Sequence, residues 1–317
     1  MDKSVLVNAS RKIKKNRPAL PVEQICQVFH TIDLLEIGFL SKQCCKDAAG
    51  SCMMCDYGFT RSTHTNDMYI KEMRKILSEF KNGFNRLLLC TNGSFMDEYQ
   101  IPEDLFCLIL SEINNHDIPE IEIETHYSNV TKKKLQLIRQ LLKGKKVIIE
   151  LGLETSNPVY QEYIIMKHID LTEFDKTISM IKNFGFEVEV NIMLGIPFLS
   201  EKNQLKDTLE TIKWVLDRNC RAIVFPMNIK PFTLLSHMYE ANHYTQISHW
   251  LVILLLDSIP AEYLNHITLA WYENREEKYE HTEKRTVFPL SCLSCHDLLM
   301  IFYTEFIQAE SAGKKKN

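Results

Sequence analysis

The feature that most constrains the fold is a regular alternation of short apolar segments with longer amphipathic ones. Six β-branched or apolar segments have the pattern of strands, and amphipathic segments with helical spacing lie between them. Because parallel strands need long crossovers, usually helices, this order predicts a parallel α/β sheet. The expected strands are residues 33–40, 86–91, 120–126, 146–153, 187–194 and 221–228, and the expected helices are 66–81, 103–115, 131–143, 171–184 and 202–218.

This alternation is compatible with an open doubly wound sheet and with a full or partial barrel. In both folds ligands bind beyond the carboxyl ends of the strands, so site residues are expected there. After about residue 230 the alternation gives way to helical segments near 234–257, and no proline-, glycine- or serine-rich linker precedes them. We therefore expect residues 1–30 to form an N-terminal extension, 31–230 the core, and 231–317 an extension packed on it.

The most unusual local feature is CCKDAAGSCMMC (44–55), which follows the first expected strand. Seven residues separate Cys44 from Cys52, and two separate Cys52 from Cys55. A [4Fe–4S] cluster takes cysteine thiolates as ligands, and three of them leave one iron open, which is typical of a reactive centre. A zinc site completed by His64 or Cys45 is the alternative, and unligated thiols are a third.

Composition and charge limit the classes of protein. The 317 residues are 45% hydrophobic and carry a net charge of −4, so the chain shows no overall charge signature of nucleic-acid binding. The basic runs 11–17 and 313–316 are expected to be solvated tails, with a docking arm for an acidic partner as the alternative. We see no signal sequence, and the apolar run 250–256 is too short for a membrane span. We expect a cytoplasmic protein, where clustered cysteines favour metal ligation or reactivity over disulfides.

Six motifs, taken in order, resemble the radical S-adenosylmethionine (SAM) superfamily. The usual cysteine spacing there is three and two residues, whereas the longer spacing in this chain resembles the branch that contains the radical SAM subunit of archaeosine synthase. The resemblance extends from about residue 33 to 297 and implies a partial (β/α)6 TIM-type barrel with a mostly helical C-terminal extension. The motifs are GSCMMCDYG, LLLCTNGSFMDEYQIP, ELGLETSN, VNIMLGIPFLSEK, NIKPFTLLSHMYE and CLSC.

The resemblance implies that Cys44, Cys52 and Cys55 hold a [4Fe–4S] cluster whose open iron binds the amino and carboxylate groups of SAM. Cys45 replaces Cys44 if the register shifts by one residue. Met54 is expected against the adenine, with plain loop packing as the alternative. The segment that follows the second strand stands in place of a Gly-Gly-Glu-like motif near the SAM amino group, although a simple turn is the alternative. Its expected SAM contacts are Asn92, Gly93 and Ser94.

Further strand ends supply the remaining expected site residues. Glu124 and Thr125 match positions that contact the ribose and carboxylate of SAM, and His126 stands where a basic residue is expected. Glu150 and Glu154 are the candidate catalytic residues; they flank one glycine and either line the barrel lumen or lie in solvent or against a helix. The resemblance also places Gly195 and Ile196 in a segment that packs on adenine.

The function implied is reductive cleavage of SAM to methionine and a 5′-deoxyadenosyl radical, which abstracts hydrogen from a substrate in the barrel. A flavodoxin- or ferredoxin-like reductant supplies the electron. The resemblance points to a modified 7-deazaguanine base in tRNA, handled with a lysine-transferring partner protein, while a small molecule or peptide is the alternative substrate. A non-catalytic zinc-binding or scaffold protein on a degenerate barrel is the competing hypothesis. No role is assigned to the second pair, Cys292 and Cys295.

Overall fold

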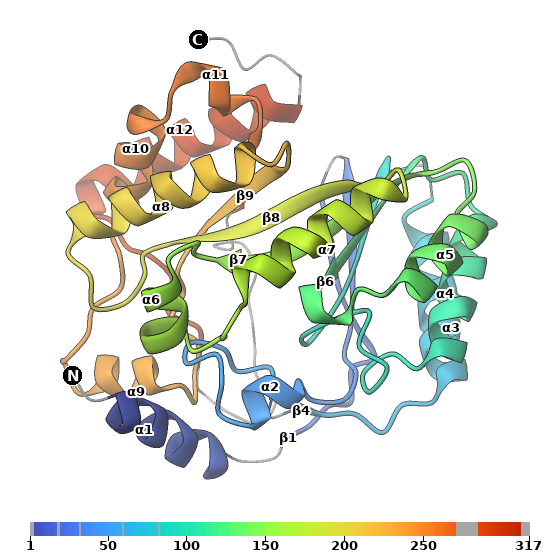
Figure 1. Cartoon of the computed structure of the whole chain (residues 1–317), viewed down its shortest axis with the longest axis horizontal. Coiled ribbons are helices and arrows are strands. Elements are labelled where there is room, and N and C mark those ends of the chain that lie inside the picture. The colour runs from blue at the N-terminus through green and yellow to red at the C-terminus, as the bar shows by residue number, and fades with distance from the viewer. Residues whose placement is uncertain are drawn as a thin grey trace.

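The computed structural model describes residues 3–17, 20–31, 33–58, 60–81, 83–270 and 285–311. Its centre is a curved sheet of eight strands, in the order β10-β9-β8-β7-β6-β5-β3-β2 (Figure 1). All neighbouring strands are parallel except β2, which runs antiparallel to β3. The strands are β2 (Cys26–His30), β3 (Leu34–Phe39), β5 (Arg86–Thr91), β6 (Glu120–Thr125), β7 (Lys146–Glu154), β8 (Glu187–Leu194), β9 (Arg221–Pro226) and β10 (Ile267–Leu269).

Helices connect these strands and cover the convex face of the sheet. Helix α7 packs on β8, and α8 packs on β8 and β9. The crossover helices are α3 (Asn66–Glu79), α4 (Glu103–Asn114), α5 (Lys132–Leu141), α7 (Leu171–Asn183) and α8 (Glu201–Leu216). Their start points follow from capping chemistry, because Thr65, Thr131 and Asp170 each accept a backbone N–H of the first turn. The fold is thus the expected partial TIM-type barrel.

Several smaller elements complete the molecule. Helices α1, α2 and α9 gather at one end of the sheet, and α10 packs on α8 (Figure 1). None of the helices in the described ranges is long and apolar enough to cross a membrane. The elements are α1 (Lys3–Lys15), β1 (Leu20–Pro21), α2 (Cys45–Ala48), β4 (Thr60–Arg61), η1 (Tyr127–Asn129), α6 (Pro158–Tyr160), η2 (Gln161–Ile165), α9 (Leu234–Glu240), α10 (His249–Ser258), α11 (Ala261–Leu264) and α12 (Leu293–Ser311).

Side-chain alternation divides each central strand into a packing face and a lumen face. On β6, Ile121 and Ile123 are fully buried in the main hydrophobic cluster, whereas Glu122 and Glu124 line the interior cavity. Strand β8 repeats this pattern with apolar residues on the packing face and Glu189 on the lumen face. The convex face therefore holds the core, and the concave face is left for polar groups.

The structure departs from the sequence-based expectations at the margins of the sheet. Strands β2 and β10 were not expected, and β2 lies within the segment 1–30 that we expected to be an extension. The stretch 234–257 forms two helices with a break between them. The domain boundaries stay a prediction, and the basic run 313–316 lies outside the described residues.

The basic run 11–17 was expected to be a solvated tail, and this expectation is wrong for two of its residues. The side chains of Lys14 and Arg17 are only 1% and 3% exposed, because both form ion pairs with the buried carboxylate of Asp47. The remainder of the run agrees better with the expectation, since Lys12 and Lys15 are exposed. Helical periodicity explains the burial of Lys14, because one face of α1 packs inward, whereas Arg17 lies in the turn that follows the helix.

Candidate functional site

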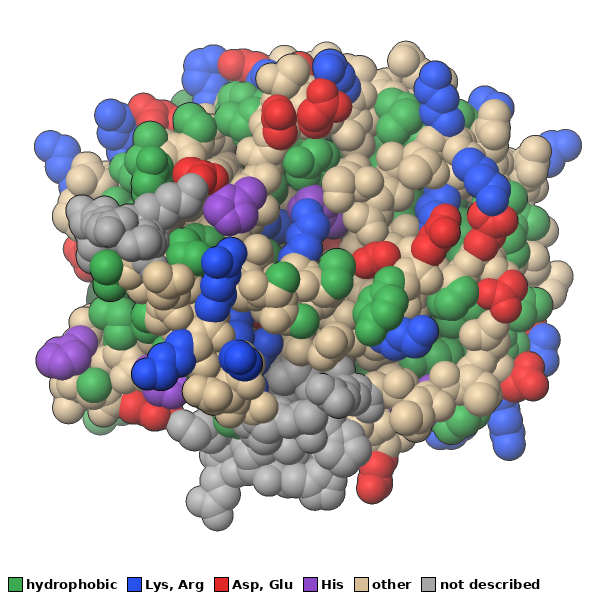
Figure 2. All heavy atoms as spheres, turned by 60° about the horizontal axis from the view of Figure 1, so that its bottom comes forward, with side chains coloured by type: hydrophobic (Ala, Val, Ile, Leu, Met, Phe, Trp, Pro, Cys, Tyr) green, Lys and Arg blue, Asp and Glu red, His purple; other side chains and the backbone are tan. Residues whose placement is uncertain are grey.

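A single cavity of about 1000 Å³ occupies the concave side of the sheet. It reaches the face that Figure 2 turns toward the viewer, where the surface is hollowed near its centre and shows Lys, Arg and His side chains. Eleven of the thirteen site residues expected from the sequence line this cavity, and they come from the cysteine loop and from the ends of β5, β6 and β7. They are Cys44, Cys52, Met54, Cys55, Asn92, Gly93, Ser94, Glu124, Thr125, Glu150 and Glu154.

The cysteine loop is anchored by backbone hydrogen bonds on both sides. The N–H of Cys44 donates to the carbonyl of Tyr57 at 2.9 Å, and the N–H of Cys52 donates to that of Met166 at 3.0 Å. Cys52 has a left-handed backbone with φ of +55°, which is uncommon for a residue with a side chain. The loop conformation is therefore fixed by partners outside it.

The three thiols are free and belong to half-buried residues. Burial raises the pKa of Cys44 above its ordinary value and that of Cys52 to about 11, and burial together with Asp47 and Cys52 raises the pKa of Cys55 well above it. Each thiol thus lies close enough to another to oppose its ionisation. Within the described residues, no three Cys, His, Asp or Glu side chains are already arranged as a metal site.

The loop after β5 lies against the first cysteine. Gly93 has φ of +147°, and a Cβ built on it would lie 3.2 Å from the Cys44 sulfur and 2.8 Å from Oε1 of Gln100. The buried Gln100 side chain holds this loop, because its Oε1 accepts the N–H of Ser94 at 2.8 Å and its Nε2 donates to the carbonyl of Asn92 at 2.9 Å. The absence of a side chain at Gly93 allows the two loops to meet.

Polar groups at the end of β6 continue this network. The hydroxyls of Ser94 and Thr125 are 2.7 Å apart, and Ser94 Oγ also accepts the N–H of His126. The Nζ of Lys46, from the cysteine loop, lies 2.9 Å from Nε2 of His126. Burial and the nearby charges of Lys167 and Lys46 lower the pKa of His126 to about 2, so its imidazole is neutral. The cations near this position are therefore Lys46 and Lys167, of which Lys46 contacts the imidazole.

Strand β7 brings two carboxylates into the lumen. Glu150 accepts a hydrogen bond of 2.6 Å from Nδ2 of Asn191, and burial together with Glu124 raises its pKa well above the ordinary value. Glu154 has φ of +71° at an irregularity in the β7–β8 ladder, and its Oε1 lies 2.7 Å from the ammonium of Lys167. Burial disfavours that ammonium, but Glu154, Cys52 and Glu124 together outweigh the effect and raise the pKa of Lys167.

Two expected residues do not line the cavity. Gly195 has φ of +103° and packs near Ile247, and Ile196 is fully buried in a hydrophobic cluster that also contains Met54. Their contact with adenine stays a prediction. The proposed fourth zinc ligand, His64, bonds the carbonyl of Gln24 at 3.0 Å and is not among the cavity-lining residues.

Three contributors to the site were not assigned from the sequence: Lys46, Gln100 and Lys167. Each of the three lies in or beside a motif, but its position in the sequence does not indicate a role at the site. Lys46 separates two cysteine positions, and Gln100 ends the motif that contains Gly93. Lys167 lies in a segment for which no strand or helix was expected. In the structure it follows a short π-helical turn, η2.

The late cysteine pair lies away from this cavity. Cys292 is exposed, Cys295 is half-buried, and the N–H of Cys295 donates to the carbonyl of Cys292 at 2.9 Å. The rings of His249 and His296 lie near each other, with centroids 5.9 Å apart. The pair receives no role.

Comparisons with known proteins agree with this geometry. The family profile of the radical SAM superfamily matches residues 44–215. Archaeosine synthase subunit beta of Methanosarcina acetivorans is 25% identical over 226 residues, which make up 70% of this chain and 65% of that protein. An uncharacterized protein of Methanocaldococcus jannaschii is 24% identical over 261 residues, 78% of this chain and 71% of that protein. The chain thus covers less than two thirds of the archaeosine synthase subunit.

Among solved structures, queuine lyase from Clostridium spiroforme, bound to SAM and queuine, has a TM-score of 0.51. The match covers 78% of this chain and 95% of that chain, at 18% identity. At 18% identity this likeness shows a shared fold alone.

Replacement of Gly93 by Ala tests the contact between the two loops. We expect Gly93→Ala to lower the free energy of unfolding more than Gly144→Ala, because both glycines have positive φ but a Cβ at Gly144 has no atom within 4 Å. The backbone cost alone is about 1 kcal/mol. Urea unfolding of the iron-free variants measures the difference, and equal losses would contradict the contact.

Proposed function

The chain belongs to the radical SAM superfamily, and on that premise we propose which residues hold the family's cofactors, SAM and a [4Fe–4S] cluster, and what the enzyme acts on. One observation carries the proposal: the three cysteines and the polar strand ends line the same cavity. A structural metal site would need its ligands near one another but would have no use for a cavity of about 1000 Å³ beside them.

Cys44, Cys52 and Cys55 are the residues proposed to hold the cluster. The donor set suits it, because all three thiols are free and lie in one loop at the cavity wall. Cys44 is favoured over Cys45 by its burial and by its place against Gly93. When both cofactors are bound, one electron supplied to the cluster cleaves SAM to methionine and a 5′-deoxyadenosyl radical, which takes a hydrogen atom from the substrate.

SAM is proposed to bind between the cysteine loop and the ends of β5 and β6. The carbonyls of the Asn92–Gly93 turn and the Ser94 hydroxyl are acceptors for an ammonium group, and Glu124 is an acceptor for ribose hydroxyls. The SAM carboxylate needs a cation, and Lys46 supplies it in place of the neutral His126. Met54 and Ile196 form an apolar cluster beside this region that suits the adenine.

We propose a modified nucleobase of the 7-deazaguanine class as the substrate. The names of two relatives, both archaeosine synthase subunit beta, support this class. The lumen supports it too, because Glu150 and Glu154 line it and carboxyl oxygens accept the N–H groups on the edge of a guanine-like ring. Glu150 and Glu154 are the residues proposed to hold the substrate near SAM, and Lys167 fixes Glu154. The electron donor is proposed to be flavodoxin- or ferredoxin-like, and a partner subunit is proposed from the names of the same relatives.

Replacement of Cys44, Cys52 and Cys55 together by Ala tests the cluster assignment. After anaerobic reconstitution with ferrous iron and sulfide, we expect about four irons per wild-type chain and almost none in the triple variant. Cys45→Ala, at the exposed neighbour, serves as the control and keeps its iron. Stoichiometric zinc in place of iron, or SAM cleavage by the triple variant, would contradict the proposal.

Lys46→Met tests the SAM carboxylate contact. Loss of a charged hydrogen bond of about 1.5–3 kcal/mol weakens SAM binding by roughly 10- to 100-fold. Lys42→Met is the matched control, because Lys42 is exposed in the same loop and its Nζ lies over the ring of Tyr99. Equilibrium binding of SAM to the reconstituted proteins is the measurement, and equal affinities in the two variants would exclude Lys46 from this role.

The substrate class is tested by the release of 5′-deoxyadenosine. We expect a lysine-linked 7-deazaguanine, free or in tRNA, to stimulate release from the reduced enzyme, because the lumen carboxylates accept its ring N–H groups. Lysine alone lacks that ring and is the control. If no deazaguanine stimulates release while the enzyme still cleaves SAM slowly, the substrate class is wrong and the enzyme class stands.

A further inference from the structure

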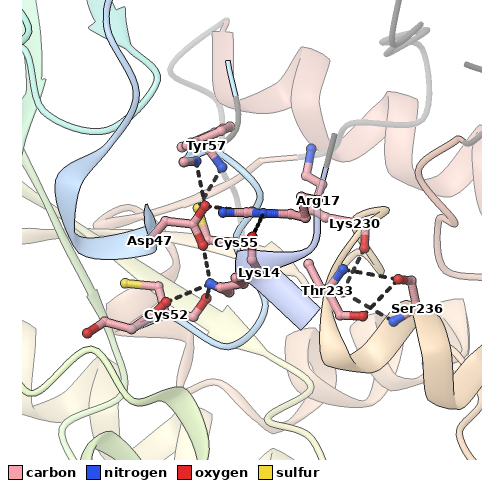
Figure 3. Close-up of polar contacts among 11 residues, drawn as sticks. Lys14, Arg17, Asp47, Cys52, Cys55, Tyr57, Lys230, Thr233 and Ser236 are labelled. Carbon is pink, nitrogen blue, oxygen red and sulfur yellow. Dashed lines mark hydrogen bonds and ion pairs between the residues drawn. The ribbon is translucent and has the colours of Figure 1, made fainter. Parts of the chain in front are cut away.

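The N-terminal helix α1 contacts the cysteine loop through three buried charges. Lys14 and Arg17 form ion pairs with Asp47, and none of the three side chains is more than 3% exposed. Figure 3 shows these residues beside Cys52 and Cys55. A buried charge is stable in a protein only where it is paired and hydrogen-bonded. These three side chains therefore require one defined arrangement.

Lys14 uses all three of its N–H donors on the loop. Its Nζ pairs with Oδ1 of Asp47 and donates to the carbonyls of Ser51 at 2.6 Å and Cys52 at 2.8 Å. The second oxygen of Asp47 accepts from Arg17 Nη1 at 2.8 Å and from the N–H of Gly58. Lys14 and Arg17 thereby bind Asp47 near the start of the loop, and Lys14 also binds the Ser51 and Cys52 carbonyls in its middle. Asp47 in turn binds Gly58 at its end.

These contacts fix the backbone of Cys52 on both sides. Its N–H is bonded to the carbonyl of Met166, and its own carbonyl is bonded to Lys14. Both bonds are needed because the left-handed φ of +55° is unfavourable for a residue with a side chain. Lys14 therefore contributes directly to the direction in which Cys52 presents its sulfur.

Lys14 places one buried positive charge beside this cysteine, in a group of charges that also contains Arg17, Asp47 and Asp56. Burial leaves little water or salt to screen the charge of Lys14. A positive charge near thiolates and an iron–sulfur cluster favours the form that carries more negative charge, which is the reduced form.

We propose that Lys14 is a positioning residue for the cluster ligand Cys52 and that its charge raises the reduction potential of the cluster. This inference rests on the proposed function, because it takes Cys52 as a ligand. It extends the site to a helix outside residues 44–215, the part that matches the family. Neither role follows from the cysteine motif itself.

Three full-length variants test the proposal after anaerobic reconstitution with ferrous iron and sulfide. Lys14→Met removes the charge and the two carbonyl bonds and leaves Asp47 paired with Arg17. The double variant Lys14→Met/Asp47→Asn loses the same carbonyl bonds but removes one charge of each sign, so its net charge is unchanged. Lys15→Met, at an exposed position on the same helix, is the control. The measurements are iron per chain after desalting, the electron paramagnetic resonance signal of the reduced cluster, and its reduction potential.

We expect both Lys14 variants to lose iron on desalting, because both lack the bonds to the loop carbonyls. Only Lys14→Met should show a more negative potential for the iron that remains, because the double variant keeps the net charge, while Lys15→Met matches the wild type. Full retention of iron in both variants, or a wild-type potential in Lys14→Met, would overturn the proposal. If the wild type itself binds no cluster, the proposed function fails instead, so the two failures are distinguishable.

A measurement on the unaltered protein covers the case in which both variants fail to fold. Because α1 already holds the loop, we expect amides of residues 46–58 to be protected from hydrogen exchange in the iron-free wild type. Exchange of this segment at the rate of an unstructured chain, with protection only after reconstitution, would overturn the inference.

Discussion

The register of the parallel ladder determines the chemistry of this molecule more than any single residue does. Glu124 is paired with Glu150, and Glu150 with Glu189, so consecutive strands place carboxylates side by side on the lumen face. Like charges at such distances are costly unless other groups compensate them. Arg221 pairs with Glu189, and Asn191 donates to Glu150, so the lumen is acidic but stabilised. The proposed substrate, which carries N–H donors, would complete that compensation.

The central strands and crossover helices were predictable because each obeys a strong local rule. Segments such as 120–126 alternate apolar and acidic residues, and helices such as α7 begin at a capping residue. The edge strands β2 and β10 were not predictable, since they are short and their pairing depends on neighbours far away in the sequence. The buried role of Lys14 was missed for a similar reason: a basic run looks solvated until its distant partner, Asp47, is known.

At the site, too, the features set by local sequence were predictable, and the contacts between segments far apart in the sequence were not. Gly93 and Glu124 were expected at strand ends and lie there, since Gly93 follows β5 and Glu124 is the last residue but one of β6, whereas Glu150 lies in the middle of β7. Nothing in the sequence indicated that Gln100 bridges the loop carbonyls or that Lys46 approaches His126, because both contacts depend on side chains that fold back across neighbouring loops. Gly195 and Ile196 were expected beside the ligand, and they lie behind the cavity wall with the apolar cluster.

Gly58 is the most restricted position in the loop that carries the cysteines. A Cβ there would overlap the Asp47 carboxylate and lie 2.5 Å from the N–H nitrogen of Ala48. Any side chain at this position would therefore displace the acid that Lys14 of α1 and Arg17, just after this helix, require. Positions 14, 17, 47 and 58 are thus physically coupled, and in evolution they should covary: a relative that lacks the basic helix has no reason to keep the acid or the glycine.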